Sequence, residues 1–443
     1  MGIFFGTDGI RGVVNDSLTF DLAYKCGNAL ASQKNKTKIL IGGDTRIHRS
    51  FLTSAFAGGA MNTGAEIIDV GICPTAGIAY LTKALKMDFG TVISASHNSA
   101  EYNGIKIFNS DGFKLGDKSE EALERRFIHE TNKEWKEIGK YEQDFSLVKL
   151  YEDYLVDACS IDLKGLTILL DGSNGASSRV APAVFRRLGA KVIATHCKLD
   201  GEHINEKCGS LHPETLAKAV KKYRADMGFA FDGDSDRIIA CDEIGNVLDG
   251  DIIIFMLAKY LQSKGSLVNN TVVGTRHTNM GLEKALNEDG ITLLRTDIGD
   301  KYVIAQIEKD KLSLGGEKSG HVIFRDYSTT GDGVLTGIKI AEMVKTLGKK
   351  LSEMSSVDLY PQCNIDCVVF DKMKIINSEK LSLETEKQEK ILGDGARIMV
   401  RVSGTENKIR IMVECKDKDV AERSAKEIEK VVYSIDRECD ERI

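Results

Sequence analysis

Short apolar runs typical of buried strands alternate with helical stretches along most of the chain, and this alternation constrains the fold more than any other feature. The order of elements recurs about every 100 residues, which indicates a repeated structural unit. Strands that alternate with helices form mainly parallel sheets with helices on both faces. The strand-like runs cover residues 38–41, 66–70, 90–93, 166–170, 191–194, 227–231, 271–274 and 292–295. The sequence therefore predicts three related doubly wound α/β domains.

The C-terminal part of the chain follows a different pattern. Two apolar runs, 396–401 and 409–413, flank a turn, and a charged amphipathic stretch follows at 421–432. This order predicts a small antiparallel α+β domain, with the charged stretch 378–390 as a solvated excursion. A chain of 443 residues has room for about two to four domains. We predict four domains around a central cleft, covering residues 1–157, 158–255, 256–368 and 369–443.

Composition excludes several classes of protein. No apolar run reaches the length of about 18 residues that a membrane span needs, so we expect no membrane partner. A net charge of −6 argues against nonspecific binding to nucleic acid. The ten cysteines form no short disulfide framework, which predicts free thiols in a reducing cytoplasm. The oligomeric state stays open, with a homodimer as one possibility.

Three carboxylates, Asp232, Asp234 and Asp236, alternate with Gly233 and Ser235 on a short segment. Such a cluster repels itself unless a cation compensates it, and Mg²⁺ prefers oxygen ligands of this kind. Apolar strand-like runs precede and follow the segment, which predicts a tight loop between two strands. A calcium loop of EF-hand type does not fit, because arginine occupies the position that needs glycine. A solvated acidic turn remains the simple alternative.

A serine on a turn, Ser96, follows the strand-like run 90–93 and is the candidate nucleophile. His97 comes next, but there is no G-x-S-x-G elbow of a serine hydrolase. In an extended backbone, His97 would also point away from the serine. The sequence thus favours a phosphate-carrying serine over a Ser-His-Asp triad.

Two further glycine-rich segments carry polar groups. Glu317, Ser319 and His321 offer a carboxylate, a hydroxyl and an imidazole, which suit sugar hydroxyls and proton transfer. Arg401 and Arg410 bracket hydroxyls and free backbone N–H groups, a pattern that suits a phosphate dianion. An ordinary surface turn is the alternative for each segment taken alone.

Together these segments resemble the signature motifs of the α-D-phosphohexomutase superfamily over essentially all 443 residues. The opening residues 5–12, the serine loop 93–98 with 103–106, the aspartate loop 232–237, the sugar loop 314–321 with 326–333, and the phosphate loop 403–406 carry the resemblance. The opening residues and the stretch 329–333 are similar to the glucosamine branch. Lys318 departs from that branch, which usually has glutamine, and Ser235 stands where glycine is common.

The resemblance implies a phosphoserine mechanism. Ser96 would carry a phosphoryl group and bind Mg²⁺ together with Asp232, Asp234 and Asp236. A sugar bisphosphate, glucosamine 1,6-bisphosphate or a similar compound, would be the intermediate and activator. The catalytic residues implied are Ser96, Arg11, Lys106 and His321; the substrate-binding residues are Glu317, Ser319, Arg237, Arg401, Ser403, Gly404, Thr405 and Arg410. Lys106 could act as a base only if its pKa were depressed.

The activity implied is the interconversion of glucosamine 6-phosphate and glucosamine 1-phosphate, which feeds synthesis of UDP-N-acetylglucosamine. The four domains would then carry, in chain order, the phosphoserine, the metal, the sugar-recognition and the phosphate-binding loops. Three alternatives stay open at this point: a phosphomannomutase/phosphoglucomutase, a noncatalytic phosphosugar-binding protein, and a metal-dependent phosphomonoesterase.

Overall fold

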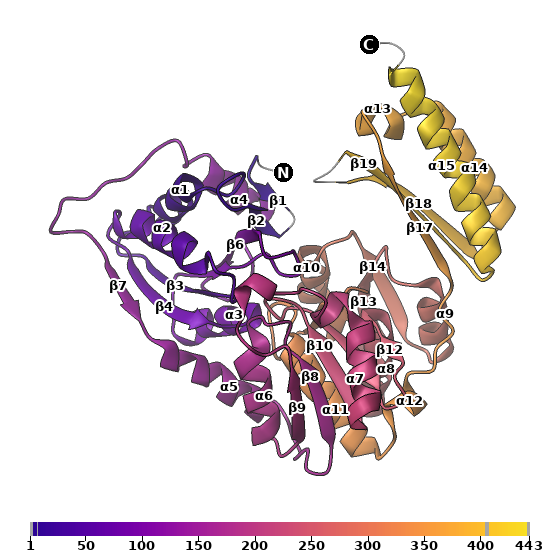
Figure 1. Ribbon diagram of the computed structural model, residues 1–443, viewed down its shortest axis with the longest axis horizontal. Coiled ribbons are helices and arrows are strands. Elements are labelled where there is room, and N and C mark those ends of the chain that lie inside the picture. Colours follow the sequence, from indigo (N-terminus) through magenta and orange to yellow (C-terminus); the bar gives the residue numbers. More distant parts are fainter. Residues whose placement is uncertain (1–2, 7, 404–406, 441–443) are drawn as a thin grey trace. The chain divides into compact units, whose positions relative to one another are not determined.

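The computed structural model describes residues 3–6, 8–403 and 407–440, without the side chains of 438–440. The chain folds into two compact units (Figure 1). The first unit comprises Met1–Thr278 and Asp289–Ser356, and the second comprises Asn279–Glu288 and Val357–Ile443. Three successive α/β sheets build the first unit, and a single antiparallel sheet builds the second.

The first sheet has seven strands in the order β1-β2-β6-β5-β3-β4-β7. Its strands are β1 Phe5–Gly6, β2 Gly9–Val13, β3 Lys38–Gly43, β4 Glu66–Ile72, β5 Phe89–Ile93, β6 Tyr102–Asn109 and β7 Lys140–Gln143. The four strands β5, β3, β4 and β7 are parallel, because helices connect them. Its helices are α1 Phe20–Ala31, α2 Arg49–Met61, α3 Thr75–Ala84, α4 Asp117–Glu124 and α5 Val148–Asp157, with the 3₁₀ turn η1 Phe145–Leu147. An apolar core lies between this sheet and α1, α2 and α4.

The second sheet has five strands in the order β12-β11-β10-β8-β9. They are β8 Thr167–Asp171, β9 Lys191–Thr195, β10 Met227–Phe231, β11 Ile238–Asp242 and β12 Val247–Leu248. Helices α6 Ser177–Arg187 and α7 Pro213–Tyr223 and the turns η2 Gly201–His203 and η3 Gly209–Leu211 connect them. Every residue of β10 and β11 is buried, as the continuous apolar runs predict. The aspartate segment is therefore a tight loop between two antiparallel strands.

The third sheet has four strands in the order β14-β13-β15-β16. They are β13 Thr271–Thr275, β14 Thr292–Thr296, β15 Leu314–Gly316 and β16 Val322–Phe324. The helices of this part are α8 Gly250–Ser263, α10 Asp300–Asp310, α11 Gly333–Leu347 and α12 Leu351–Met354, with η4 Val268–Asn270. Asp332 caps α11 by accepting the Leu335 N–H at 2.9 Å, and Tyr151 of α5 donates to the same carboxylate at 2.7 Å. This contact joins the first and third α/β parts within the unit.

The second unit is an antiparallel sheet in the order β17-β19-β18, covered by helices. Its strands are β17 Gln362–Val368, β18 Ala396–Val402 and β19 Lys408–Cys415, and its helices are α9 Met280–Glu288, α13 Lys372–Ile376, α14 Glu379–Leu392 and α15 Lys418–Asp440. The charged stretch 378–390, predicted as a solvated excursion, is a helix with most of its side chains not buried. Leu381 is buried in the core, while Glu384 and Lys387 pair on the surface at 3.0 Å.

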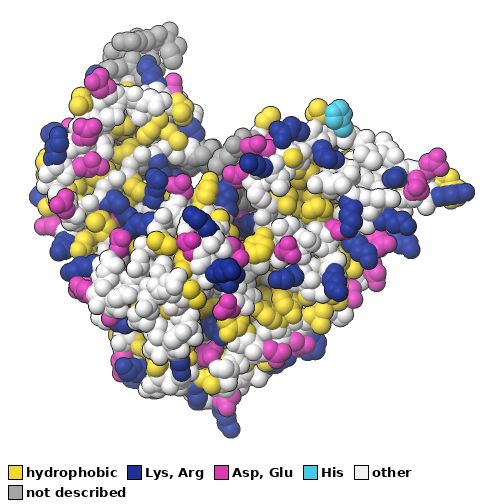
Figure 2. Space-filling view, turned by 180° about the vertical axis from the view of Figure 1, so that it is seen from behind, with side chains coloured by type: hydrophobic (Ala, Val, Ile, Leu, Met, Phe, Trp, Pro, Cys, Tyr) yellow, Lys and Arg dark blue, Asp and Glu magenta, His cyan; other side chains and the backbone are white. Residues whose placement is uncertain are grey.

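The predicted fold class, three α/β domains followed by a small α+β domain, is confirmed. Among the described residues, no helix is both long and apolar enough to cross a membrane. On the described face in Figure 2, Lys and Arg side chains are interspersed with Asp and Glu side chains.

Candidate active site

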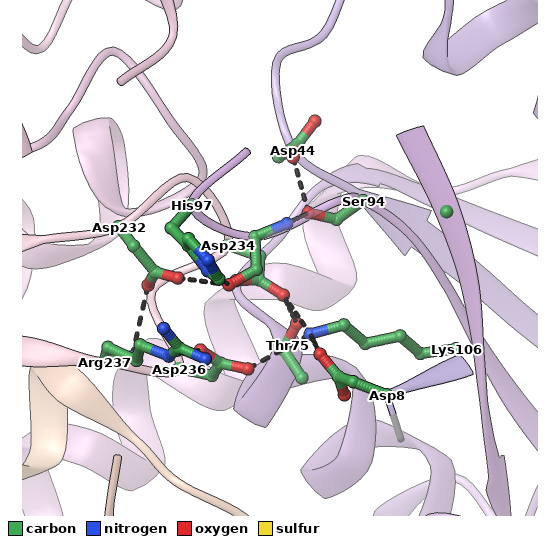
Figure 3. A network of polar contacts seen from close by, with 12 residues as sticks. Asp8, Asp44, Thr75, Ser94, His97, Lys106, Asp232, Asp234, Asp236 and Arg237 are labelled. Carbon is green, nitrogen blue, oxygen red and sulfur yellow. Dashed lines mark hydrogen bonds and ion pairs between the residues drawn. The ribbon is translucent and has the colours of Figure 1, made fainter. Parts of the chain in front are cut away.

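The serine and aspartate segments meet where two strands of different sheets end. Ser96 lies just beyond β5 of the first sheet, and Asp232 follows β10 of the second. Ligands of open α/β sheets bind outside such carboxyl ends. Ser96 Oγ donates a hydrogen bond to Asp232 Oδ2 at 2.5 Å, and both residues are fully buried. The candidate nucleophile and the candidate metal loop therefore form one site (Figure 3).

Ser96 has a left-handed backbone conformation, with φ of +53°. Its N–H is held by Ser94 Oγ at 2.9 Å, and the Ser94 hydroxyl donates to Asp44. Because the backbone is not extended here, His97 turns back, and its Nδ1 lies 3.4 Å from Ser96 Oγ. The argument that His97 points away from the serine is therefore wrong. Burial, together with Arg237 and Arg11, lowers the pKa of His97 to about 4, so the ring is neutral at neutral pH.

A buried arginine, Arg46, fixes the shape of the serine loop. Its guanidinium donates to the carbonyls of Ser96 at 3.0 Å and Asn98 at 2.7 Å. It also donates to the carbonyls of Ser99 and Tyr102, and its Nε contacts Asp44 at 3.0 Å. One side chain thus binds four carbonyls of the loop. The buried charge of Arg46 is tolerated because the Asp44 carboxylate and these four carbonyls accept hydrogen bonds from its guanidinium.

Asn205 supports the same loop from the second sheet. Its side-chain amide donates to the carbonyls of Ser96 at 2.9 Å and Asn98 at 3.0 Å. Sequence reasoning missed Asn205, Asp44 and Arg46. The run Gly42-Gly43-Asp44-Thr45-Arg46 directly after a predicted strand was the one available signal, because turns at strand ends carry function in α/β folds.

The three aspartates of the loop are buried and fit a hard divalent cation. One carboxylate oxygen of each lies within 4.8 Å of the others. Asp234 Oδ1 and Asp236 Oδ1 are buried and have no hydrogen-bond partner among the described residues. Burial and the neighbouring carboxylates of Asp236 and Asp234 raise the pKa of Asp232 well above its usual range. A cation would relieve this repulsion, and the all-oxygen ligands suit Mg²⁺.

Lys106 of β6 lies against these carboxylates (Figure 3). Its Nζ is 2.7 Å from Asp234, 3.1 Å from Asp236 and 3.1 Å from Asp8. Burial disfavours the charge, but the three carboxylates outweigh it and raise the pKa of Lys106 well above its usual value. The depressed pKa that a basic Lys106 would need is absent from this arrangement.

Asp8 pairs with three cations beside the site. It pairs with Arg11, with Lys106 and with Lys114, whose Nζ lies 2.5 Å from Asp8 Oδ1. Lys114 also pairs with Asp300 of the third α/β part. Arg11 donates to Asn98 Oδ1 at 3.3 Å, and its Nε is buried without a partner among the described residues. Asp8, Lys114 and Asp300 were not predicted, because their partners are distant in sequence.

His321 is buried beside Asp236 and Asp300, with ring nitrogens 3.8 Å and 3.5 Å from their carboxylates. Burial opposes the charged ring, yet hydrogen bonding to Asp236 and the charge of Asp300 raise the pKa of His321. The Gly331 N–H donates to Nε2 at 2.8 Å, so the proton of the neutral ring lies on Nδ1. A Cβ at Gly331 would lie 2.6 Å from the ring, so this glycine permits the contact.

Arg237, Glu317 and Ser319 line the same region. The Arg237 N–H donates to Asp232 Oδ1 at 3.2 Å, and its buried Nε has no hydrogen-bond partner among the described residues. Glu317 accepts the Gly299 N–H at 3.1 Å, and burial raises the pKa of its carboxyl. Ser319 Oγ is likewise buried without such a partner. These groups could all turn to a polar ligand.

The remaining predicted residues lie in the second unit. Arg401 of β18 is directly opposite Arg410 of β19, and burial and this second guanidinium lower the pKa of Arg401. Like charges directly opposite one another are unfavourable, and Asp366 of β17, whose Oδ1 lies 3.7 Å from Arg410 Nε, offsets part of this repulsion. Ser403 is buried, and its N–H donates to the Lys408 carbonyl at 2.9 Å. The predicted residues Gly404 and Thr405 lie outside the described residues.

Comparisons with known proteins agree with the fold. Four domain families described as phosphoglucomutase/phosphomannomutase match the chain: alpha/beta/alpha domains I, II and III at residues 2–134, 148–245 and 249–360, and the C-terminal domain at 365–431. The chain therefore belongs to the phosphoglucomutase/phosphomannomutase family of phosphohexomutases, which are enzymes of the isomerase class.

Within that family, the full-length relatives that the chain resembles are phosphoglucosamine mutases. The protein of that name from Caldanaerobacter subterraneus subsp. tengcongensis is 45% identical, with 97% of this chain and 98% of the relative covered. The protein of that name from Clostridium novyi is 43% identical, with 98% and 99% covered.

Solved structures share the fold. A phosphoglucomutase/phosphomannomutase family protein from Burkholderia thailandensis has a TM-score of 0.82 at 24% identity, covering 98% of each chain. An N-acetylphosphoglucosamine mutase from Aspergillus fumigatus, solved with GlcNAc-6P and magnesium, has a TM-score of 0.69 at 15% identity, covering 98% of this chain and 96% of that one.

Proposed function

We propose that this phosphohexomutase interconverts glucosamine 6-phosphate and glucosamine 1-phosphate, with Ser96 as the residue that carries the phosphoryl group. The observation that carries the proposal is the hydrogen bond from Ser96 Oγ to Asp232 inside a buried cluster of three carboxylates. The names of the full-length relatives support the choice of glucosamine. We place the reaction in the cytoplasm, in keeping with the nine described cysteines, all free.

The chemistry proposed is phosphoryl transfer in two opposite half-reactions. A sugar hydroxyl attacks the phosphorus on Ser96, the Ser96 Oγ–P bond breaks, and a sugar bisphosphate forms. The intermediate turns over, and its other phosphoryl group returns to Ser96 Oγ. Bound Mg²⁺, held by Asp232, Asp234, Asp236 and the phosphoserine, would neutralise charge on the transferring group. A glucosamine bisphosphate or a similar compound would therefore also prime an unphosphorylated chain.

Several cations would stabilise the phosphoryl charge. Arg11 and Arg237 each carry a buried Nε without a hydrogen-bond partner among the described residues, and both lie beside the serine and aspartate loops. We propose Lys106 as a charged group that can donate a proton, because its three carboxylate neighbours keep it protonated. We propose that His321, whose Nε2 accepts a backbone N–H, orients the sugar and completes the acid/base pair.

Sugar and distal-phosphate recognition are assigned to separate segments. Glu317 and Ser319 would bind sugar hydroxyls, since both are polar groups in a buried loop of the first unit. In the second unit, Arg401, Ser403 and Arg410, with Gly404 and Thr405, would bind the phosphate that does not react. The facing guanidinium groups of Arg401 and Arg410 support an anion there.

The test compares turnover of glucosamine, glucose and mannose 6-phosphates by the purified full-length chain with Mg²⁺ and a matching bisphosphate. We expect the highest kcat/KM for glucosamine 6-phosphate and no bulk release of inorganic phosphate. A higher kcat/KM for glucose or mannose 6-phosphate would make the chain a phosphomannomutase/phosphoglucomutase instead. Stoichiometric phosphate release would indicate a phosphomonoesterase, and the absence of turnover on all three would indicate a noncatalytic binder.

A further inference from the structure

A second cluster of metal-ligating side chains lies at the carboxyl edge of the second sheet, apart from the three-aspartate loop. Asp171 is the last residue of β8, and His196 directly follows β9, which runs parallel beside it (Figure 1). Cys208 lies in the next connection, immediately before η3. One ligand atom of each of these three residues lies within 4.8 Å of the others. The proposed phosphomutase reaction uses none of them.

The geometry within the cluster suits a shared ion. His196 Nδ1 lies 2.9 Å from Asp171 Oδ2, while Asp171 Oδ1 accepts the Ser173 N–H at 3.0 Å. The backbone contact orients the carboxylate, as neighbours of metal ligands commonly do. Asp171 and Cys208 are buried, whereas the His196 side chain is 36% exposed, which leaves an open side for entry and for a fourth ligand.

The backbone around the cluster is strained. His196 and Lys207, the residue before Cys208, have φ of +47° and +53°, a conformation that side-chain-bearing residues rarely adopt. Ser173 and Asn174, which follow the Asp171 strand, have φ of +50° and +54°. Strained residues of this kind concentrate at functional sites, where the surrounding structure holds them in place.

We propose that Asp171, His196 and Cys208 form a site for a thiophilic divalent cation such as Zn²⁺, distinct from the Mg²⁺ ligands. A thiolate, an imidazole and a carboxylate are the ligand types that Zn²⁺ selects, and three protein ligands with one open position give a tetrahedral site. Mg²⁺ binds thiolates poorly and prefers oxygen, so the two sites would take different ions. Metal binding releases the thiol proton of Cys208 to solvent.

Such an ion would stabilise the segment that supports the serine loop. Asn205, three residues before Cys208, donates to the carbonyls of Ser96 and Asn98, and its N–H donates to the Ser173 carbonyl at 3.0 Å. The segment from His196 to Cys208 therefore lies between the proposed ion and the serine loop. An ion bound to both ends of this segment would reduce its motion without touching the reacting groups.

The experiment titrates Co²⁺ into the chelator-treated full-length chain in the presence of excess Mg²⁺. Co²⁺ on a thiolate gives a near-ultraviolet charge-transfer band and the strong visible bands of tetrahedral coordination. We expect both to saturate at one Co²⁺ per chain and to disappear when Zn²⁺ is added, because Zn²⁺ binds such sites more tightly. Hydrogen exchange between residues 196 and 209 should slow when Zn²⁺ binds.

Two ligand variants and two controls make the assignment specific. Cys208→Ala should abolish the bands, and the partly exposed His196→Gln should weaken Co²⁺ binding by at least about ten-fold. Cys26→Ser, a buried thiol of α1, and Asp234→Asn should both keep the bands. The thermal midpoint without metal shows whether each variant is folded. Absence of the bands from the unaltered chain, their survival in folded Cys208→Ala, unweakened Co²⁺ binding by folded His196→Gln, their loss in folded Asp234→Asn, or unchanged exchange would each overturn the proposal.

Discussion

At the scale of single residues, the candidate site depends on buried groups that hold Ser96, the proposed phosphoryl carrier, in an unfavourable backbone conformation. The left-handed Ser96 is stabilised by two hydrogen bonds: its N–H donates to Ser94 Oγ, and its carbonyl accepts from Arg46. Arg46 also donates to three other carbonyls of the loop. An arginine can contact several carbonyls at once because its five donors lie in a rigid plane. Arg46 is therefore a positioning residue that touches none of the reacting atoms.

Arg46→Lys tests this role. Lysine keeps the charge beside Asp44 but cannot reach the same four carbonyls, so the loop should shift while the fold survives. We expect kcat to fall by about 10- to 100-fold with little change in KM, since small misplacement of reacting groups is costly. The matched control is Arg49→Lys on α2, whose arginine pairs with Asp69 of β4 and which should be kinetically silent. A normal kcat in folded Arg46→Lys would refute the positioning role.

Ser235 illustrates the same conflict between side chain and backbone. Its φ is +62°, and its buried Oγ has no hydrogen-bond partner among the described residues. Both facts give a physical reason why glycine would suit this position better. The serine is tolerated because its carbonyl accepts the Gly333 N–H at 3.0 Å and the loop is packed on all sides.

At the scale of elements, the loop between β10 and β11 brings three carboxylates together, and only cations relieve their mutual repulsion. Asp234→Asn removes one charge at nearly constant volume. We expect the Mg²⁺ concentration for half-maximal activity to rise by at least about ten-fold, with partial rescue at high Mg²⁺. Asp200→Asn, an exposed carboxylate paired with His203, is the control. Identical Mg²⁺ dependence in Asp234→Asn and the unaltered chain would show that this loop does not bind the ion.

The N-terminal cap of α11 makes stability depend on pH. Burial raises the pKa of Asp332 from 3.8 to about 6. Between pH 3.8 and about 6, Asp332 is therefore protonated in the folded state but ionised in the unfolded state, which increases the free energy of unfolding. This increase is lost as the pH rises through about 6. Asparagine caps without ionising. The thermal midpoint of Asp332→Asn relative to the unaltered chain should therefore increase from pH 4 to pH 7.

Calorimetry at several pH values measures this difference. Asp326→Asn, which changes an exposed carboxylate a few residues away, should show no such trend. A constant difference in thermal midpoint between Asp332→Asn and the unaltered chain would mean that Asp332 is ionised throughout.

Sequence reasoning found the elements and loops whose signals are local. The runs 227–231 and 238–241 predicted the two strands around the aspartate loop, because continuous apolar stretches identify buried strands. It could not find Asn205 or Asp300, since their contacts join segments that are distant in sequence. It gave the α14 region only as a solvated excursion and not as a helix, because few of its side chains, such as Leu381, are buried in the core.

At the scale of the whole molecule, the proposed reaction needs an intermediate that is retained while it turns over. The second unit carries the guanidinium pair assigned to the distal phosphate. Arg410→Ala should raise KM for either sugar phosphate by about ten-fold or more, as expected for loss of a charge-assisted contact. More bisphosphate should also escape into solution, while phosphorylation of Ser96 survives.

Arg423→Ala, on the exposed face of α15, is the control. Unchanged KM and bisphosphate release would make this hairpin a structural turn.

The central claim is that Ser96 carries the transferred phosphoryl group, and intact-mass measurement tests it most directly. The purified full-length chain is measured before and after treatment with glucosamine 1,6-bisphosphate, and the modified peptide is sequenced. We expect the fully treated chain to carry one phosphoryl group, located on Ser96, and expect its removal when excess hexosamine monophosphate is added. Ser96→Ala should gain none and should show no turnover while remaining folded. A phosphoryl group on another residue, or normal turnover by Ser96→Ala, would contradict the account.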